Sequence, residues 1–91
     1  MVDRTSSTPL YGIAVAAHLL GVPEASLRLF ETRGLLTPSR TEGGTRRYSD
    51  DDLTRLRRIT ALREQGVNLE GILRVLELQD ENRALRDELN G

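Results

Sequence analysis

The side chains best suited to bind a charged ligand are arginines gathered in the middle of the chain. Arg28 lies in a helix-forming run, and Arg40, Arg46 and Arg47 flank a Gly43-Gly44 pair. A planar guanidinium donates two parallel hydrogen bonds, which suits phosphate oxygens and the edge of guanine. A helix followed by a basic hairpin therefore predicts two arginine-bearing probes, set side by side, that contact adjacent parts of one DNA duplex.

The predicted DNA-contacting residues are Ser26, Arg28, Arg40, Thr45, Arg46, Arg47 and Tyr48. Arg28 could reach a base edge or a neighbouring phosphate, and Ser26 could bond a phosphate from the same helix. The mobile hairpin tip would follow the DNA backbone or enter the minor groove. Tyr48 is expected mainly to pack beneath the hairpin, although its hydroxyl could stay free for a phosphate.

Each of these basic residues also has a plainer interpretation. Arg28 alone could solvate an exposed helix face, and the hairpin arginines could belong to a solvated turn. The arginines of the following helix are expected on a solvated face or beside acids of their own helix. It is the order of turn, helix and hairpin that favours DNA binding.

Two short helices joined by a tight turn are predicted to position the first probe. Residues 14–20 are helix-prone and end at Gly21, and a second helix over residues 23–33 begins at Pro23 and ends before Gly34. The residues able to face a core are Val15, Ala16, Leu19, Leu20, Leu27 and Phe30. The two helices make a helix-turn-helix.

A hairpin and two longer helices complete the predicted fold, which is mainly α. Residues 36–49 form the hairpin, or wing, and Ser49 caps a helix that ends at Gln65-Gly66 and buries Leu53, Leu56, Ile59 and Leu62. Asn68 caps the last helix. In that helix Leu69, Ile72, Leu73 and Leu76 have the spacing of a stripe lying on a globular core.

A second apolar pattern follows in the same helix. Val75, Leu78, Asn82, Leu85 and Leu89 alternate by three and four residues, which predicts a coiled-coil seam between two copies of the chain. Two heptads are few, but the tail has nothing else to bury against. The predicted domains are a disordered lead-in over residues 1–9, a winged helix-turn-helix over 10–74 and a dimerisation helix over 75–91.

Charge is distributed unevenly along these 91 residues. The net charge is −1, yet the segment from Arg28 to Arg63 holds nine Arg against five acids, whereas residues 67–91 hold three Arg against six acids. The excess of basic residues is therefore confined to one segment of the chain. With no Cys and no apolar run of membrane-spanning length, the sequence predicts a cytoplasmic, nucleoid-associated protein with no membrane partner.

Catalytic and metal chemistry are not expected. His18 is the only histidine, and one histidine without Cys or clustered carboxylates is a poor metal site. No Ser is matched to a catalytic base, and no Gly-rich phosphate loop is present. We therefore expect no enzyme activity, no cofactor and no bound metal.

Several of these residue runs together resemble the MerR family of bacterial transcription regulators. The runs are Leu27 to Glu31 with Gly34 to Leu36, Arg40 to Ser49, and Asp52-Leu53. The segment Gly66 to Ile72 is similar to the heat-shock repressor, or HspR-like, branch of the family. The resemblance implies a homodimer through an antiparallel coiled coil, bound to an inverted-repeat promoter site, with Arg28 and Arg47 as the family's usual DNA-contacting arginines.

The resemblance also implies further partners. HspR-like members repress chaperone genes with a chaperone as co-repressor, so a chaperone co-regulator or RNA polymerase is the expected protein partner. The sequence ends at Gly91 without an effector domain, and direct metal or drug sensing is not expected. Two other functions stay open: an architectural or excisionase-like protein that bends DNA, and an adaptor that binds a protein through the coiled coil.

Overall fold

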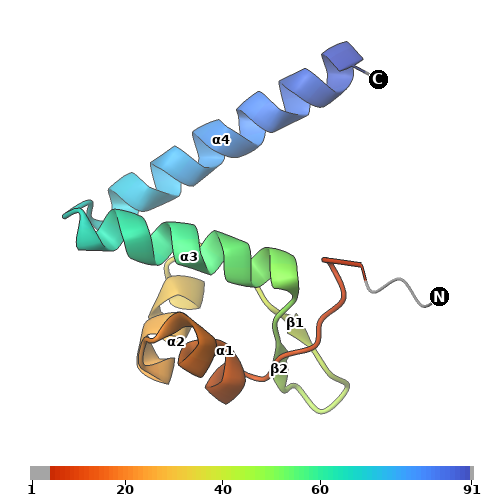
Figure 1. The fold of residues 1–91 in the computed structure, drawn as a ribbon, viewed down its shortest axis with the longest axis vertical. Helices are drawn as coiled ribbons and strands as arrows, with labels where there is room; N and C mark the ends of the chain where they lie inside the picture. The colour runs from red at the N-terminus through yellow and green to blue at the C-terminus, as the bar shows by residue number, and fades with distance from the viewer. Residues whose placement is uncertain (1–4, 91) are drawn as a thin grey trace.

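Helix α3 runs through the middle of the fold and the other elements lie on either side of it. The computed structural model describes residues 5–90. The elements are α1 (Ile13–Leu20), α2 (Glu24–Thr32), β1 (Ser39–Arg40), β2 (Arg46–Arg47), α3 (Asp50–Glu64) and α4 (Leu69–Asn90). Figure 1 shows α1, α2 and the hairpin on one side of α3, with α4 on the other side and projecting away from it. The mainly helical architecture is as predicted.

The first two helices form the predicted helix-turn-helix. The chain bends by 105° between α1 and α2. Gly21 takes a left-handed φ of 69° at the end of α1, which favours glycine, and Pro23 precedes α2. No single helix among residues 5–90 is long and apolar enough to cross a membrane, and α1 and α2 meet that test of length and composition only as a bent pair.

A single core joins the helix-turn-helix, the wing and the two long helices. The buried apolar residues are Ala16, Ala17, Leu27, Phe30, Leu35, Leu36, Tyr48, Leu53, Leu56, Ile59, Leu62, Ile72 and Leu76. The apolar stripes predicted for α3 and for the first part of α4 are thus confirmed. The prediction for α1 is corrected: Val15 and Leu19 are about half exposed, because α1 turns Ala16 and Ala17 toward α2 and α3 and so points its other face outward.

The wing is a short antiparallel hairpin that also pairs with the segment before α1. Ser39 faces Arg47 and Arg40 faces Arg46 across the two strands. Beyond β2, Tyr48 forms an isolated bridge with Tyr11, and its amide nitrogen donates to the Tyr11 carbonyl at 2.7 Å. The hairpin is therefore attached to the base of α1 as well as to α3.

The second half of the predicted lead-in, residues 1–9, contacts the start of α3. Residues 1–4 lie outside the described residues. Thr5 to Thr8 form a turn, and the Ser6 carbonyl accepts a hydrogen bond of 2.9 Å from the Asp51 amide in the first turn of α3. The first amides of a helix have no partner within the helix, and this contact satisfies one of them.

The two long helices begin at side-chain caps, as predicted. The Ser49 hydroxyl accepts from the Asp52 amide at 3.0 Å, and the Asp52 carboxylate accepts from the Ser49 amide at 2.9 Å, which makes a capping box. At the start of α4, the Asn68 side chain accepts from the Gly71 amide at 2.8 Å. These caps fix where α3 and α4 start and hence how the wing enters α3.

Replacing the capping serine should measurably destabilise the domain. Ser49→Ala removes the acceptor for an amide at the start of α3, so we expect the free energy of unfolding to fall by about 1 kcal/mol. Thr54→Ala is the control, because the exposed Thr54 hydroxyl only donates to the Asp50 carbonyl of its own helix. Equal urea midpoints for Ser49→Ala and the wild-type protein would contradict the cap.

Candidate nucleic-acid interface

The predicted DNA-contacting residues come from α2 and the wing, which lie on the side of α3 opposite α4 (Figure 1). Arg28 is on α2, while Arg40, Arg46 and Arg47 are on the two strands. Side chains of α2 and of the wing are in direct contact. The sequence-based expectation of two adjacent basic probes therefore agrees with the arrangement of the elements.

Arg28 is an exposed cation on α2. Its guanidinium lies 3.3 Å from the Glu24 carboxylate one turn earlier, and about half of each side chain is accessible to solvent. Exposed ion pairs of this spacing contribute little stability, so a phosphate or a base could replace Glu24 as the partner at small cost. The plainer interpretation of Arg28 as a solvated residue describes the unbound protein, and it leaves the side chain available for DNA.

Two of the three wing arginines are held by one carboxylate. Glu31, near the end of α2, accepts from Arg46 Nε at 2.7 Å and from Arg40 NH2 at 2.8 Å. The hydrogen bond from Arg46 is the main reason that the pKa of Glu31 lies below its usual value. The stabilisation from this carboxylate is therefore complete at neutral pH and is lost only as the pH falls through the lowered pKa.

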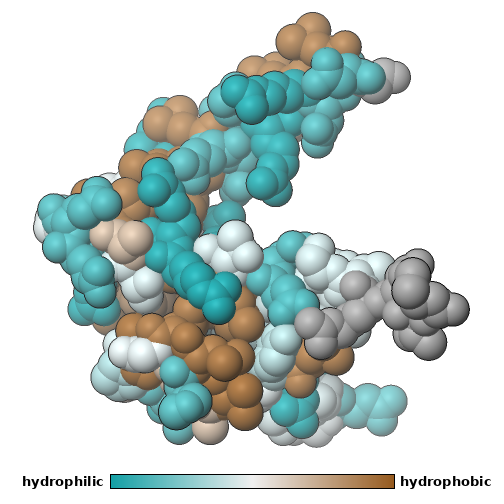
Figure 2. Space-filling model, viewed as in Figure 1, coloured by the Kyte–Doolittle hydropathy of each residue, from teal (hydrophilic) through white to brown (hydrophobic). Residues whose placement is uncertain are grey.

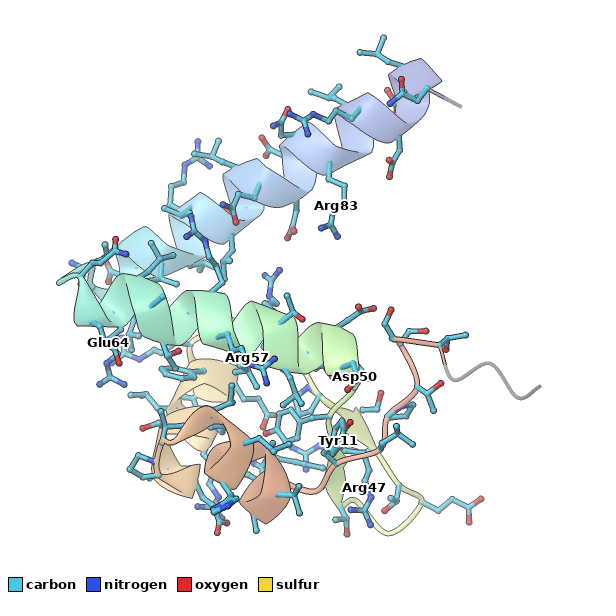
Figure 3. The ribbon with its side chains drawn as sticks, in the orientation of Figure 1. Tyr11, Arg47, Asp50, Arg57, Glu64 and Arg83 are labelled. Carbon is cyan, nitrogen blue, oxygen red and sulfur yellow. The ribbon has the colours of Figure 1, made fainter. Side chains whose placement is uncertain are left out.

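Arg47 is the wing arginine that is left without a carboxylate partner among residues 5–90. Its side chain is half-buried and crosses the backbone at the base of α1, where a Cβ on Gly12 would lie 3.0 Å from Arg47 NH1. Figure 3 shows Arg47 on the hairpin below Tyr11. Among the described residues, no acid pairs with Arg47, and its guanidinium occupies the space that a side chain at position 12 would need.

Tyr48 does not reach the surface, which corrects its place among the predicted DNA contacts. The side chain is 1% exposed, and its hydroxyl oxygen is buried without a hydrogen-bond partner among the described residues. Burial raises the pKa of this phenol. The prediction that Tyr48 packs beneath the wing is confirmed, and the idea that its hydroxyl stays free for a phosphate is wrong.

Ser26 and Thr45 are peripheral to the arginines. Ser26 is half-buried and lines a depression of about 280 Å³ between α2 and α3, together with Phe30 and Arg63. Thr45 is exposed at the end of the hairpin loop, where its amide donates to the Thr41 hydroxyl at 3.2 Å. Neither position excludes a phosphate contact, so both stay predictions.

The arginines of α3 have partners that the sequence did not suggest. Arg55 Nε donates to the Leu35 carbonyl at 2.8 Å, and its NH1 lies 3.3 Å from the Asp80 carboxylate on α4. Arg63 lies over the Phe30 ring, 5.6 Å from its centroid. The expectation of partners within the same helix is wrong for these two, because the neighbouring helices bring a carboxylate and an aromatic ring closer.

Glu31 is the residue that sequence reasoning missed. The charge pattern of the sequence nevertheless contains a signal for it. Of the five acids between Arg28 and Arg63, three belong to the first turn of α3 and one lies at the hairpin tip. Glu31 is the remaining acid, and it lies among arginines that need a counter-charge.

Within the described part of the chain, no three His, Asp or Glu residues are grouped as a metal site.

The helix-turn-helix, its wing and the following helices match one known family. The model of the MerR HTH family of regulatory proteins matches residues 11–79. The chain belongs to the MerR family. This confirms the resemblance inferred from the sequence, and the matched family consists of regulatory proteins rather than enzymes.

Individual relatives agree with this assignment. A putative heat shock protein HspR of Streptomyces coelicolor is 44% identical over 80 residues, which are 87% of this chain and 53% of that protein. The transcriptional regulator GlnR of Bacillus anthracis is 35% identical over 80 residues, 88% of this chain and 62% of that protein. The chain therefore spans somewhat more than half the length of these two relatives.

Solved structures show the same fold. HiNmlR, a MerR-family regulator lacking the sensor domain and bound to promoter DNA, superimposes with a TM-score of 0.72 at 31% identity, covering 86% of this chain and 65% of that one. The N-terminal part of MtaN, a Bacillus subtilis multidrug transporter activator, gives 0.69 at 30% identity, covering 88% and 85%. The arrangement of α1, α2, wing and α3 is thus that of this family's DNA-binding domain.

The buried hydroxyl of Tyr48 gives a test of its assignment to the core. Tyr48→Phe removes an unpaired buried polar atom and keeps the ring, so we expect the free energy of unfolding to stay equal or to rise by up to about 1 kcal/mol. DNA affinity should not change. A clear loss of stability, or of affinity without loss of stability, would mean that the hydroxyl has a partner in solution.

Proposed function

We propose that this protein is a sequence-specific regulator of transcription that binds double-stranded DNA as a homodimer on an inverted-repeat promoter site. The observation that carries the proposal is that two of the predicted DNA-contacting arginines are not bound by the Glu31 carboxylate, Arg28 on the second helix of a helix-turn-helix and Arg47 on the adjacent wing. The second helix of this motif enters the major groove, and a wing beside it contacts the flanking backbone. Neither α2 nor the wing covers α4, which lies on the opposite side of α3 (Figure 1).

The uncovered apolar edge of α4 supports the dimer. Beyond Leu76 the helix leaves the core, and Leu78, Leu85 and Leu89 are 47%, 59% and 86% exposed in the single chain. Figure 2 shows hydrophobic residues along the edge of α4 that faces away from α3 in this view. With Val75, which is partly buried against the core, and Asn82, these leucines form the predicted seam, and a second copy of the helix would cover it. Asn82 would then fix the register, at some cost in stability.

The domain boundary proposed at residue 75 falls inside a continuous helix. α4 runs unbroken from Leu69 to Asn90, and Arg55 ties it to the rest of the domain through Asp80. A rigid connection of this kind would hold the two DNA-binding units of a dimer at a set separation. The similarity to HspR, together with the dimer, favours a chaperone co-regulator or RNA polymerase as a further partner at the nucleoid.

The site assignment can be tested by DNA binding of single arginine variants. Duplexes selected by the wild-type protein would be titrated by fluorescence anisotropy. Arg28→Ala should relax preference at one base position by about 1–3 kcal/mol, and Arg47→Ala should weaken binding to all sequences and flatten the salt dependence. The control is Arg83→Ala, which removes the same charge from α4. Wild-type affinity in both test variants would refute the assignment.

The seam can be tested without disturbing the core. Leu85→Glu places a carboxylate in the predicted seam at a position that is 59% exposed in the single chain, so the monomer should stay folded while the dimer dissociates. Ala84→Glu adds the same charge on the neighbouring residue, outside the seam, and should leave the dimer intact. Analytical ultracentrifugation distinguishes the two. A Leu85→Glu protein that sediments as a dimer would exclude this seam.

A further inference from the structure

One side chain connects the recognition helix to the wing. Glu31 is on α2, and its two carboxylate oxygens are used by different strands: Oε2 accepts from Arg40 on β1 and Oε1 accepts from Arg46 on β2. The Glu31 side chain is only 21% exposed. Arg40 also donates from NH1 to the Gly44 carbonyl at 2.9 Å, which ties the hairpin tip into the same network.

The network compensates an unfavourable arrangement of charge. Arg40 and Arg46 are directly opposite each other in the two-stranded register, and like charges at such positions repel. A carboxylate shared between them replaces that repulsion by two charge-assisted hydrogen bonds, which are short and directional. The hydrogen bond that Arg46 donates to Glu31 correspondingly raises the pKa of Arg46. Glu31 therefore adds a polar connection between α2 and both strands of the wing to the apolar packing of the core.

We propose that Glu31 is a specificity-determining positioning residue, which holds the wing at a set angle to α2 and withholds Arg40 and Arg46 from non-specific phosphate contacts. The inference rests on the proposed DNA-binding function. In this arrangement the wing is a rigid element whose available cation is Arg47, in place of the mobile basic tip that the sequence predicts. Sequence preference then depends on α2 and the wing meeting the duplex together, and sequence-independent binding is kept low because two cations are already paired.

Removing the carboxylate separates this role from a simple change of charge. Glu31→Gln removes the charge and one of the two acceptor oxygens and so loosens the hold on both arginines; affinity for a scrambled duplex should therefore rise and its salt dependence should steepen. The wing also loses its fixed angle, so the ratio of specific to non-specific affinity should fall about tenfold. Glu42→Gln is the matched control, since Glu42 is an exposed acid at the hairpin tip with no ion pair among the described residues. It removes the same charge and should leave the ratio near the wild-type value.

A charge-conserving variant isolates geometry. Glu31→Asp keeps the negative charge on a shorter side chain that cannot reach both strands, so the ratio should still fall while the non-specific salt dependence changes less than in Glu31→Gln. Amide hydrogen exchange without DNA gives an independent readout. Exchange at Thr41, whose amide donates to the Thr45 carbonyl, should be faster in both Glu31 variants and unchanged in Glu42→Gln.

The possible outcomes are distinguishable. If the wild-type protein binds no duplex in preference to another, the proposed function fails, while the exchange data still report on the wing. If the wild-type protein discriminates and Glu31→Gln behaves like Glu42→Gln in affinity ratio, the role of Glu31 is overturned. A fall in the ratio for both Glu31 variants, with thermal melting that shows folded protein, supports it.

Discussion

The burial of the apolar face of α3 is the constraint on which the rest of the structure depends. Leu56 and Ile59 are almost completely buried, and α3, which carries them, lies between the helix-turn-helix on one side and α4 on the other (Figure 1). A domain of this size buries only a small apolar core, so each element must pack against the same central helix. The direction of α3 therefore sets where the recognition helix, the wing and the projecting helix lie relative to one another.

Polar contacts at the ends of α3 refine these directions. At its start, the Ser49 capping box and the bond from Asp51 to Ser6 fix the wing and the N-terminal segment. Further along, Arg55 joins the loop after α2 to α4 through Leu35 and Asp80. These bonds add modest stability individually, but they determine angles that non-directional apolar packing leaves loose. For a protein that would bind two DNA half-sites, such angles control the separation of the two binding surfaces.

Whether an arginine is available to bind a ligand depends on the partners that its guanidinium has within the fold. The chain carries thirteen Arg and a net charge of −1. In the fold, Arg40 and Arg46 share Glu31, Arg55 faces Asp80, and Arg63 covers Phe30. These guanidinium groups form contacts that connect elements of the unbound protein. Of the predicted DNA-contacting arginines, Arg28 has only an exposed ion pair and Arg47 has no acidic partner among the described residues.

The sequence by itself determined the features that depend on local chemistry and periodicity. The turn at Gly21, the Ser49 and Asn68 caps and the stripe on α3 follow from residues a few positions apart, because φ preferences, capping and helical repeat act over one or two turns. Only the tertiary structure decided which residues lie together across the fold. It buried the Tyr48 hydroxyl, turned Val15 and Leu19 outward, placed Ser6 at the start of α3, and brought Glu31 to the wing. These outcomes depend on distances between segments far apart in the chain, which the local pattern of residues does not encode directly.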